Sequence, residues 1–110
     1  MAIHYCAAFK RQLRRLSRKY RHIRSDLQPI IVRIEAGETP GDRIPSVGHI
    51  VYKVRAPNSD AGRGKTGGYR IIYLHTEENI VLISIYSKTE QSDIEVTEIA
   101  RIIREEDTSY

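Results

Sequence analysis

The chain is organised around residues 50–88, which read IVYKVR, then APNSDAGRGKTG, then GYRIIYLHTEENIVLISIYSK. Alternating side chains, rich in β-branched and aromatic types and bounded by turn-forming residues, predict three strands of one antiparallel sheet. Lys53 and Arg55 share a face of the first strand, because successive side chains of a strand point to opposite faces. Four cations on this sheet indicate a surface that binds phosphate: Lys53, Arg55, Arg70 and Lys88.

The segment before the sheet predicts two helices. Apolar residues recur at helical spacing across residues 7–21. Ser25 and Gln28 form a capping box, which predicts a second helix that ends near Gly37. Pro29 falls in the first turn of that helix or just beyond it, where its missing amide hydrogen costs little. We expect the two helices to form a hairpin.

The two ends of the chain complete the predicted fold. Ser92 and Glu95 form a second capping box, and the isoleucines around and after it predict a final helix. Residues 2–6 are expected to form a brief edge strand, and the turn-rich residues 37–48 link the helices to the sheet. The predicted fold class is α+β: an N-terminal helical hairpin packed on a small antiparallel sheet, with a C-terminal helix, in one domain over residues 1–110.

Positive charge is concentrated near the N-terminus. The formal net charge of +4 favours an anionic partner. A solvated face is one interpretation of the basic first helix, and contact with RNA phosphates or an acidic protein is the other. We favour contact, because neighbouring like charges destabilise a lone helix. The eight cations with no acid among them are Lys10, Arg11, Arg14, Arg15, Arg18, Lys19, Arg21 and Arg24, and the candidate RNA-binding residues are Arg11, Arg14, Arg15, Arg18 and Lys19.

The loop GRGKTGG resembles the end of a phosphate-binding Walker A motif, but it joins two predicted strands. A Walker A loop instead leads into a helix whose N-terminus faces the phosphates, so nucleotide hydrolysis is excluded. Arg63 and Lys65 either are solvated or close over a polyanion, and both interpretations stay open.

Several classes of site and location are disfavoured. Cys6 is the only cysteine, which rules out an intramolecular disulfide, makes a thiolate zinc site implausible and fits a reducing compartment. The four histidines are scattered without metal-ligand spacing, so no metal is expected. No apolar run approaches the roughly 18 residues that span a bilayer, and the N-terminus lacks a signal-peptide core. We expect a cytoplasmic protein without membrane contact.

The motifs VYKVR, GGYRIIY and IYSKTEQSDI, in this order around a basic glycine-rich loop, resemble the RelE/ParE superfamily of toxins from bacterial type II toxin-antitoxin modules. The similarity extends over the whole chain and is strongest to the RelE- and HigB-like mRNA interferases. It implies a small α+β enzyme that cleaves mRNA on the ribosome and is held inactive by a cognate antitoxin. Operator DNA would be bound only by the complex with the antitoxin.

The resemblance also implies a mechanism without a metal or other cofactor. The 2′-hydroxyl attacks the adjacent phosphorus and leaves a 2′,3′-cyclic phosphate and a 5′-hydroxyl. Arg70 and Arg55 would stabilise charge on the phosphate, while Lys53 would take a proton or stabilise charge further. Lys88 would donate a proton or hold a phosphate. Tyr86 would stack on a base or move a proton.

This chain departs from the family pattern at two positions. Several members have an arginine after the lysine of the third strand and a tyrosine at the start of the last helix, where this chain has Thr89 and about Glu95. Glu90 and Asp93 belong either to a local group with Tyr86 and Lys88 or to the N-terminus of the final helix, where acidic side chains complement the helix dipole. We favour the helix interpretation.

Two rival functions remain. A ParE-like toxin would inhibit DNA gyrase by binding it, and the cations of the sheet would then be dispensable. A catalytically degenerate module would bind only RNA or its antitoxin, in a salt-dependent way and without cleavage.

Overall fold

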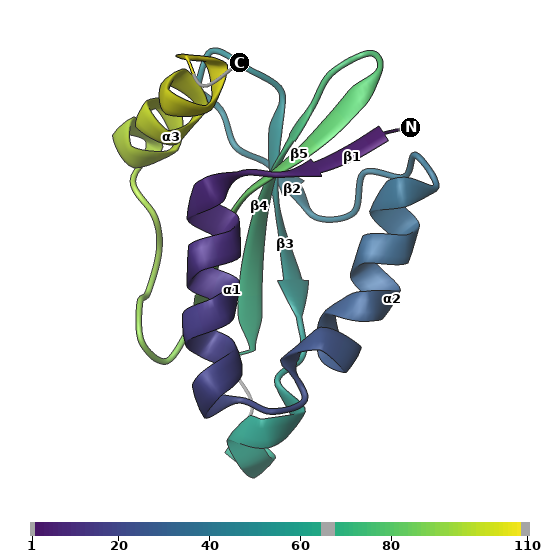
Figure 1. The fold of residues 1–110 in the computed structure, drawn as a ribbon, viewed down its shortest axis with the longest axis vertical. Helices are drawn as coiled ribbons and strands as arrows, with labels where there is room; N and C mark the ends of the chain where they lie inside the picture. The colour runs from purple at the N-terminus through teal and green to yellow at the C-terminus, as the bar shows by residue number, and fades with distance from the viewer. Residues whose placement is uncertain (1, 65–67, 109–110) are drawn as a thin grey trace.

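The computed structural model describes residues 2–64 and 68–108, which form three α-helices, one 3-10 helix and a five-stranded sheet of order β1-β5-β4-β3-β2 (Figure 1). The three predicted strands are its centre. The strands are β1 (Ala2–Tyr5), β2 (Asp42–Arg43), β3 (Val51–Ala56), β4 (Tyr69–His75) and β5 (Asn79–Ser87).

The prediction of an α+β fold is confirmed, but the sheet is mixed rather than antiparallel. β3, β4 and β5 are antiparallel neighbours, as predicted, whereas β1 runs parallel to β5. No tight turn connects β1 to β5, so their direction is set by the whole fold and not by a local signal. The predicted edge strand at residues 2–6 is confirmed. β2 lies within residues predicted to be turns, and two residues are too few to show a periodic pattern.

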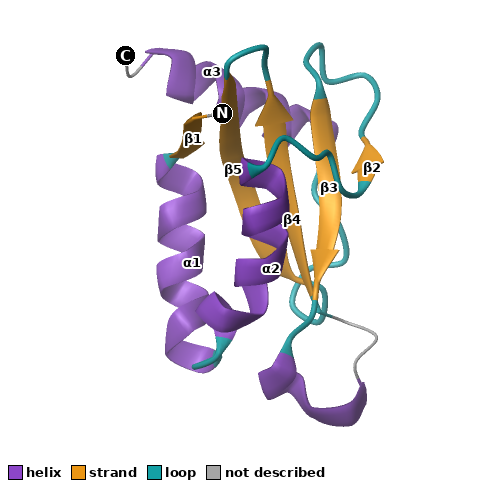
Figure 2. Ribbon diagram, turned by 90° about the vertical axis from the view of Figure 1, so that its right-hand side faces the viewer, coloured by secondary structure: helices purple, strands orange, loops and turns teal. Residues whose placement is uncertain are grey.

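α1 (Ala7–Lys19) runs along β5 past the end of β1 (Figure 2). Its buried Phe9 and Leu16 face the core. The side-chain oxygen of Gln12 accepts hydrogen bonds from the backbone N–H of Ile85 and from Ser84 Oγ, both at 3.0 Å. Gln12 therefore takes the place of a neighbouring strand where β1 has ended, and it satisfies a backbone donor of β5.

The other two helices lie on opposite faces of the sheet: α2 (Ile23–Glu35) on one and α3 (Val96–Thr108) on the other (Figure 1). A groove of ≈ 550 Å³, lined by residues of both helices, lies between α1 and α2, so the predicted helical hairpin is confirmed only in part. α3 buries three isoleucines, Ile99, Ile102 and Ile103. No helix in the described part of the chain is long and apolar enough to cross a membrane.

Both predicted capping boxes are wrong. α2 begins at Ile23, so Ser25 lies inside its first turn and donates to the carbonyl of His22 at 2.9 Å. Pro29 consequently lies inside the helix, beyond the first turn. α3 begins at Val96, and the amides of Glu98 and Ile99 donate to the backbone carbonyl of Glu95, so the helix starts after Glu95 and not at Ser92. The first helix also ends earlier than predicted, at Lys19.

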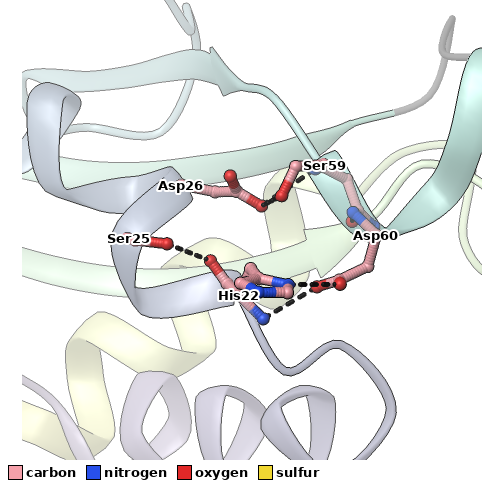
Figure 3. Close-up of polar contacts among 6 residues, drawn as sticks. His22, Ser25, Asp26, Ser59 and Asp60 are labelled. Carbon is pink, nitrogen blue, oxygen red and sulfur yellow. Dashed lines mark hydrogen bonds and ion pairs between the residues drawn. The ribbon is translucent and has the colours of Figure 1, made fainter.

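A 3-10 helix, η1 (Ser59–Gly64), opens the loop between β3 and β4 and is fastened to the start of α2 (Figure 3). The carboxylate of Asp60 accepts the backbone N–H of His22 at 2.8 Å and lies 2.7 Å from His22 Nδ1. In return, Asp26 accepts hydrogen bonds from the backbone N–H and the hydroxyl of Ser59, at 2.9 and 3.0 Å. These four residues hold the beginning of the loop against the start of α2.

The contact between Asp60 and His22 predicts a measurable dependence of stability on pH. The hydrogen bond from the His22 side chain, followed by that from its backbone, lowers the pKa of Asp60 below its ordinary value of 3.8. A lowered pKa stabilises the fold above the unfolded-state value, and this contribution is lost as the pH falls through the folded-state pKa. The Asp60→Asn variant should therefore lose less stability than wild type as the pH falls from about 6 to about 3. The measurement is the decrease in the urea midpoint of unfolding between these two pH values. His22→Ala should reduce the same slope, and Asp60→Asn should change it less in that background than in wild type, because only the backbone N–H at position 22 would still lower the pKa of Asp60. Full additivity of the two substitutions would contradict the assignment.

Candidate functional site

Three of the predicted site residues form a row across the three central strands. Arg55 of β3 pairs with Arg70 of β4, and Arg70 pairs with Tyr86 of β5. Residues directly opposite in antiparallel strands point to the same face with their Cβ atoms about 5 Å apart. Lys53 lies two residues before Arg55 and so shares this face. We call Lys53, Arg55, Arg70 and Tyr86 the sheet patch.

The two arginines of the sheet patch are unequally exposed. The Arg70 side chain is almost fully enclosed, with 7% of the residue exposed, and its Nη1 donates to the carbonyl of Tyr69 at 3.4 Å. Arg55 is exposed. Like charges directly opposite one another destabilise a sheet, so an anion close to this pair of arginines would be stabilised.

A carboxylate also reaches the sheet patch. Oδ1 of Asp93 accepts the backbone N–H of Ile94 at 2.8 Å, the Lys53 ammonium at 3.3 Å and the Tyr86 hydroxyl at 3.3 Å. The hydrogen bond from Ile94, and then that from Lys53, holds the pKa of Asp93 below its usual range. The interpretation of Asp93 as a helix-dipole residue is wrong, because α3 begins only at Val96 and the carboxylate turns back to the sheet.

The phenol of Tyr86 is a hydrogen-bond donor at neutral pH. Burial, reinforced by the negative charge of Asp93 and the hydrogen bond to it, raises the pKa of Tyr86 to about 12, although Arg70 opposes this shift. A group with this pKa keeps its proton near pH 7. Tyr86 is therefore suited to donate a hydrogen bond or a proton and not to take one.

The ammonium of Lys88 is engaged by a backbone group of its own loop. Its ammonium donates to the backbone carbonyl of Ser92, four residues further along the same loop. Its backbone N–H donates to the carbonyl of Gly68 at 3.0 Å, which fixes the start of this loop beside the start of β4. Lys88 thus braces the loop that carries Asp93.

Glu90, on the same loop, pairs with the basic helix. Its carboxylate accepts hydrogen bonds from Arg15 Nη1 at 2.9 Å and from Lys19 Nζ at 3.3 Å. The Arg15 contact in particular lowers the pKa of Glu90. The helix-dipole interpretation is wrong for Glu90 as well, and two of the eight cations that the sequence left without an acid are compensated. The segment between β5 and α3 returns past the end of α1, which no local pattern reveals (Figure 1).

The remaining predicted RNA-binding residues are placed only in part. Arg11, Arg14 and Arg18 are exposed on α1, and Arg14 also lines the groove between α1 and α2. The backbone of Arg63 lies in η1. Lys65 is outside the described residues. Within the described ranges, no three His, Cys, Asp or Glu side chains come together as a metal site.

The fold and the sheet patch define a small α+β protein with a basic sheet face beside a basic helix. A family model, the RelE toxin of the RelE / RelB toxin-antitoxin system, matches residues 7–107. The chain therefore belongs to the RelE toxin family, as its motifs indicated. It is the toxin of a toxin-antitoxin system, and a cognate antitoxin is its implied partner. A search of curated proteins gave no match.

Proposed function

We propose that this toxin is a metal-independent endoribonuclease that cleaves mRNA on the ribosome and so inhibits translation. The observation that supports the proposal most is the level row of Arg55, Arg70 and Tyr86 across three strands. Cations and a protonated phenol on one rigid sheet suit a reaction in which negative charge develops on a phosphate. Toxins of this family are generally endoribonucleases.

The proposed chemistry is an internal transfer at phosphorus. The 2′-hydroxyl gives up its proton to solvent water as its oxygen bonds to the adjacent phosphorus, and the bond from phosphorus to the 5′-oxygen breaks. The 5′-oxygen takes up a proton, so the products are a 2′,3′-cyclic phosphate and a 5′-hydroxyl. Arg70 and Arg55 donate hydrogen bonds to the phosphate oxygens as their charge rises, and Lys53 adds a further positive charge. We assign proton donation to the leaving 5′-oxygen to Tyr86 rather than to Lys88, because the Lys88 ammonium is bound to Ser92.

The basic helix and the loop after β3 are proposed to hold the ribosome. Arg11, Arg14 and Arg18 offer exposed cations on α1, and Arg63 and Lys65 would add two from the loop. Contacts of this kind with rRNA phosphates weaken as salt rises, because counterions released on binding are recaptured. Operator DNA is assigned only to the complex with the antitoxin.

The test of the proposal is direct analysis of the products. Purified toxin added to ribosomes carrying a defined mRNA should release fragments with a cyclic phosphate at one end and a 5′-hydroxyl at the other. In cells, pulse labelling should show translation stopping before replication. Replication stopping first would favour gyrase inhibition instead, and salt-sensitive ribosome binding without fragments would favour a catalytically degenerate module.

Tyr86→Phe should lower the cleavage rate by about 100-fold, within the usual range for loss of a general acid. The measurement is the single-turnover rate on programmed ribosomes. A substrate with sulfur in place of the leaving 5′-oxygen needs no protonation and should restore most of the lost rate. Tyr52→Phe is the matched control, because Tyr52 points to the other face and stacks on Tyr73 with ring centroids 5.4 Å apart. A folded Tyr86→Phe variant that cleaves both substrates at the wild-type rate would contradict the assigned role.

A further inference from the structure

The contacts of Asp93 show where an anion sits in the sheet patch. Three donors meet at a single oxygen, Oδ1: the backbone N–H of Ile94, the ammonium of Lys53 and the hydroxyl of Tyr86. Two of the three donors belong to residues proposed to act on the scissile phosphate. Donors that converge on a carboxylate oxygen have the arrangement that a phosphate oxygen requires, because both are anionic acceptors of similar size.

The position of Asp93 in the chain would allow its side chain to rotate out of the sheet patch. It lies between β5 and α3 in a segment without helix or strand, and 65% of its side chain is exposed. The segment is held elsewhere: Glu90 binds Arg15 and Lys19 of α1, and the Lys88 ammonium binds the carbonyl of Ser92. Rotation of the Asp93 side chain would therefore break two exposed contacts, with Lys53 and the backbone N–H of Ile94, and one part-buried hydrogen bond, from the Tyr86 hydroxyl.

We propose that Asp93 is an internal substitute for the substrate phosphate: in the free toxin its carboxylate occupies the anion position of the sheet patch, and the RNA phosphate displaces it. This inference rests on the proposed function, since it takes the sheet patch as the phosphate site. Asp93 then competes with RNA. A site that is only partly available binds with an affinity reduced by the available fraction, so loss of the Asp93 charge should tighten binding.

The opposite role for Asp93 predicts the opposite result. A carboxylate that had to hold Lys53 and Tyr86 in place during the reaction would make them less effective when removed. Binding and turnover separate the two roles, because a competing group acts on KM and a positioning group acts on kcat.

Asp93→Asn is the informative substitution. The asparagine keeps an oxygen for the Ile94 N–H and the Tyr86 hydroxyl, and it removes only the charge that pairs with Lys53. Affinity for a short RNA made uncleavable by 2′-deoxy substitution should rise on the order of threefold to fivefold, as expected for one exposed ion pair. On programmed ribosomes KM should fall by a similar factor, with kcat not reduced. Lower kcat at unchanged KM would overturn the proposal.

Glu90→Gln is the matched control for net charge. It makes the same charge change on the same loop, but the partners of Glu90 lie on α1, outside the sheet patch. In a Lys53→Met background, the gain from Asp93→Asn should largely disappear, whereas any gain from Glu90→Gln should persist. Equal gains from both substitutions, each independent of Lys53, would show that only net charge matters and would overturn the proposal. The proposed function fails separately, if wild-type toxin binds RNA but releases no fragments.

Discussion

Replacing Arg70 with Ala is expected to lower the rate of mRNA cleavage by about 10²- to 10³-fold, the usual cost of removing one donor that stabilises charge in a transition state. Arg70 lies in the middle of the row, between Arg55 on one strand and Tyr86 on the other. Arg70 therefore takes the central position of the proposed site, so the loss should be large. The single-turnover rate on programmed ribosomes measures it, and loss of growth inhibition in cells should accompany it.

Two further variants separate the role of Arg70 from its burial. Arg70→Lys keeps the charge but loses the planar pair of donors, and should give an intermediate rate. Arg101→Ala removes an exposed arginine of α3, which pairs with Glu98 and Glu105, and should cleave like wild type. Urea unfolding shows whether each variant is folded under the assay conditions. A folded Arg70→Ala variant with full cleavage would mean that the sheet patch is not the active site.

Replacing Gly41 with Ala should lower the free energy of unfolding by about 2 to 5 kcal/mol, from strained backbone together with overpacking. Gly41 has φ of +97°, and a Cβ atom there would lie 2.2 Å from the carbonyl oxygen of Lys53 and 2.8 Å from Cβ of Val54. Both neighbours belong to β3, so the strand would have to move. Cleavage should fall as well, because Lys53 would move with its strand.

Gly37→Ala supplies the control for this substitution. Gly37 has a similar φ of +91°, but a Cβ atom there would meet nothing within 4 Å. Only the cost of the left-handed backbone remains, about 1 to 2 kcal/mol. Urea midpoints of the two variants give the comparison. Equal losses would show that the close approach of Gly41 to β3 does not matter.

The sequence predicted the faces of the sheet better than its register. Alternation within β3 placed Lys53 and Arg55 on one face, and the structure agrees. Alternation cannot predict that Arg55, Arg70 and Tyr86 lie directly opposite one another, because alternation does not determine the register between strands. The register depends on the connection from β3 to β4, and on the irregularity between Ile72 and Tyr73 in the pairing of β4 with β5. The direction of β1 was similarly out of reach.

The residues that the strands contribute to the candidate site were predicted from the sequence, but the contribution of the loop between β5 and α3 was not. Strand residues are fixed by a period of two, whereas the segment between β5 and α3 has no period, and its acids were assigned to the wrong partner. Capping residues near Ser92 suggested an early helix start, which would have turned Glu90 and Asp93 toward a helix dipole. Instead, Glu90 reaches α1 and Asp93 reaches β3 and β5. The short run of Tyr86, Lys88, Glu90 and Asp93 was the only signal of this arrangement.

The position of Gln12 has a consequence for how the toxin behaves in a crowded cell. An exposed edge strand has unpaired backbone N–H and C=O groups, which can pair with a strand of another molecule and so start aggregation. Proteins prevent this by covering or blocking such edges. The backbone N–H of Ile85, to which a strand of another molecule could pair, already donates a hydrogen bond to the Gln12 side chain of α1. Removing that side chain would expose the edge while leaving the cationic face unchanged, so precipitation, rather than loss of chemistry, should be the first defect of a Gln12→Ala protein.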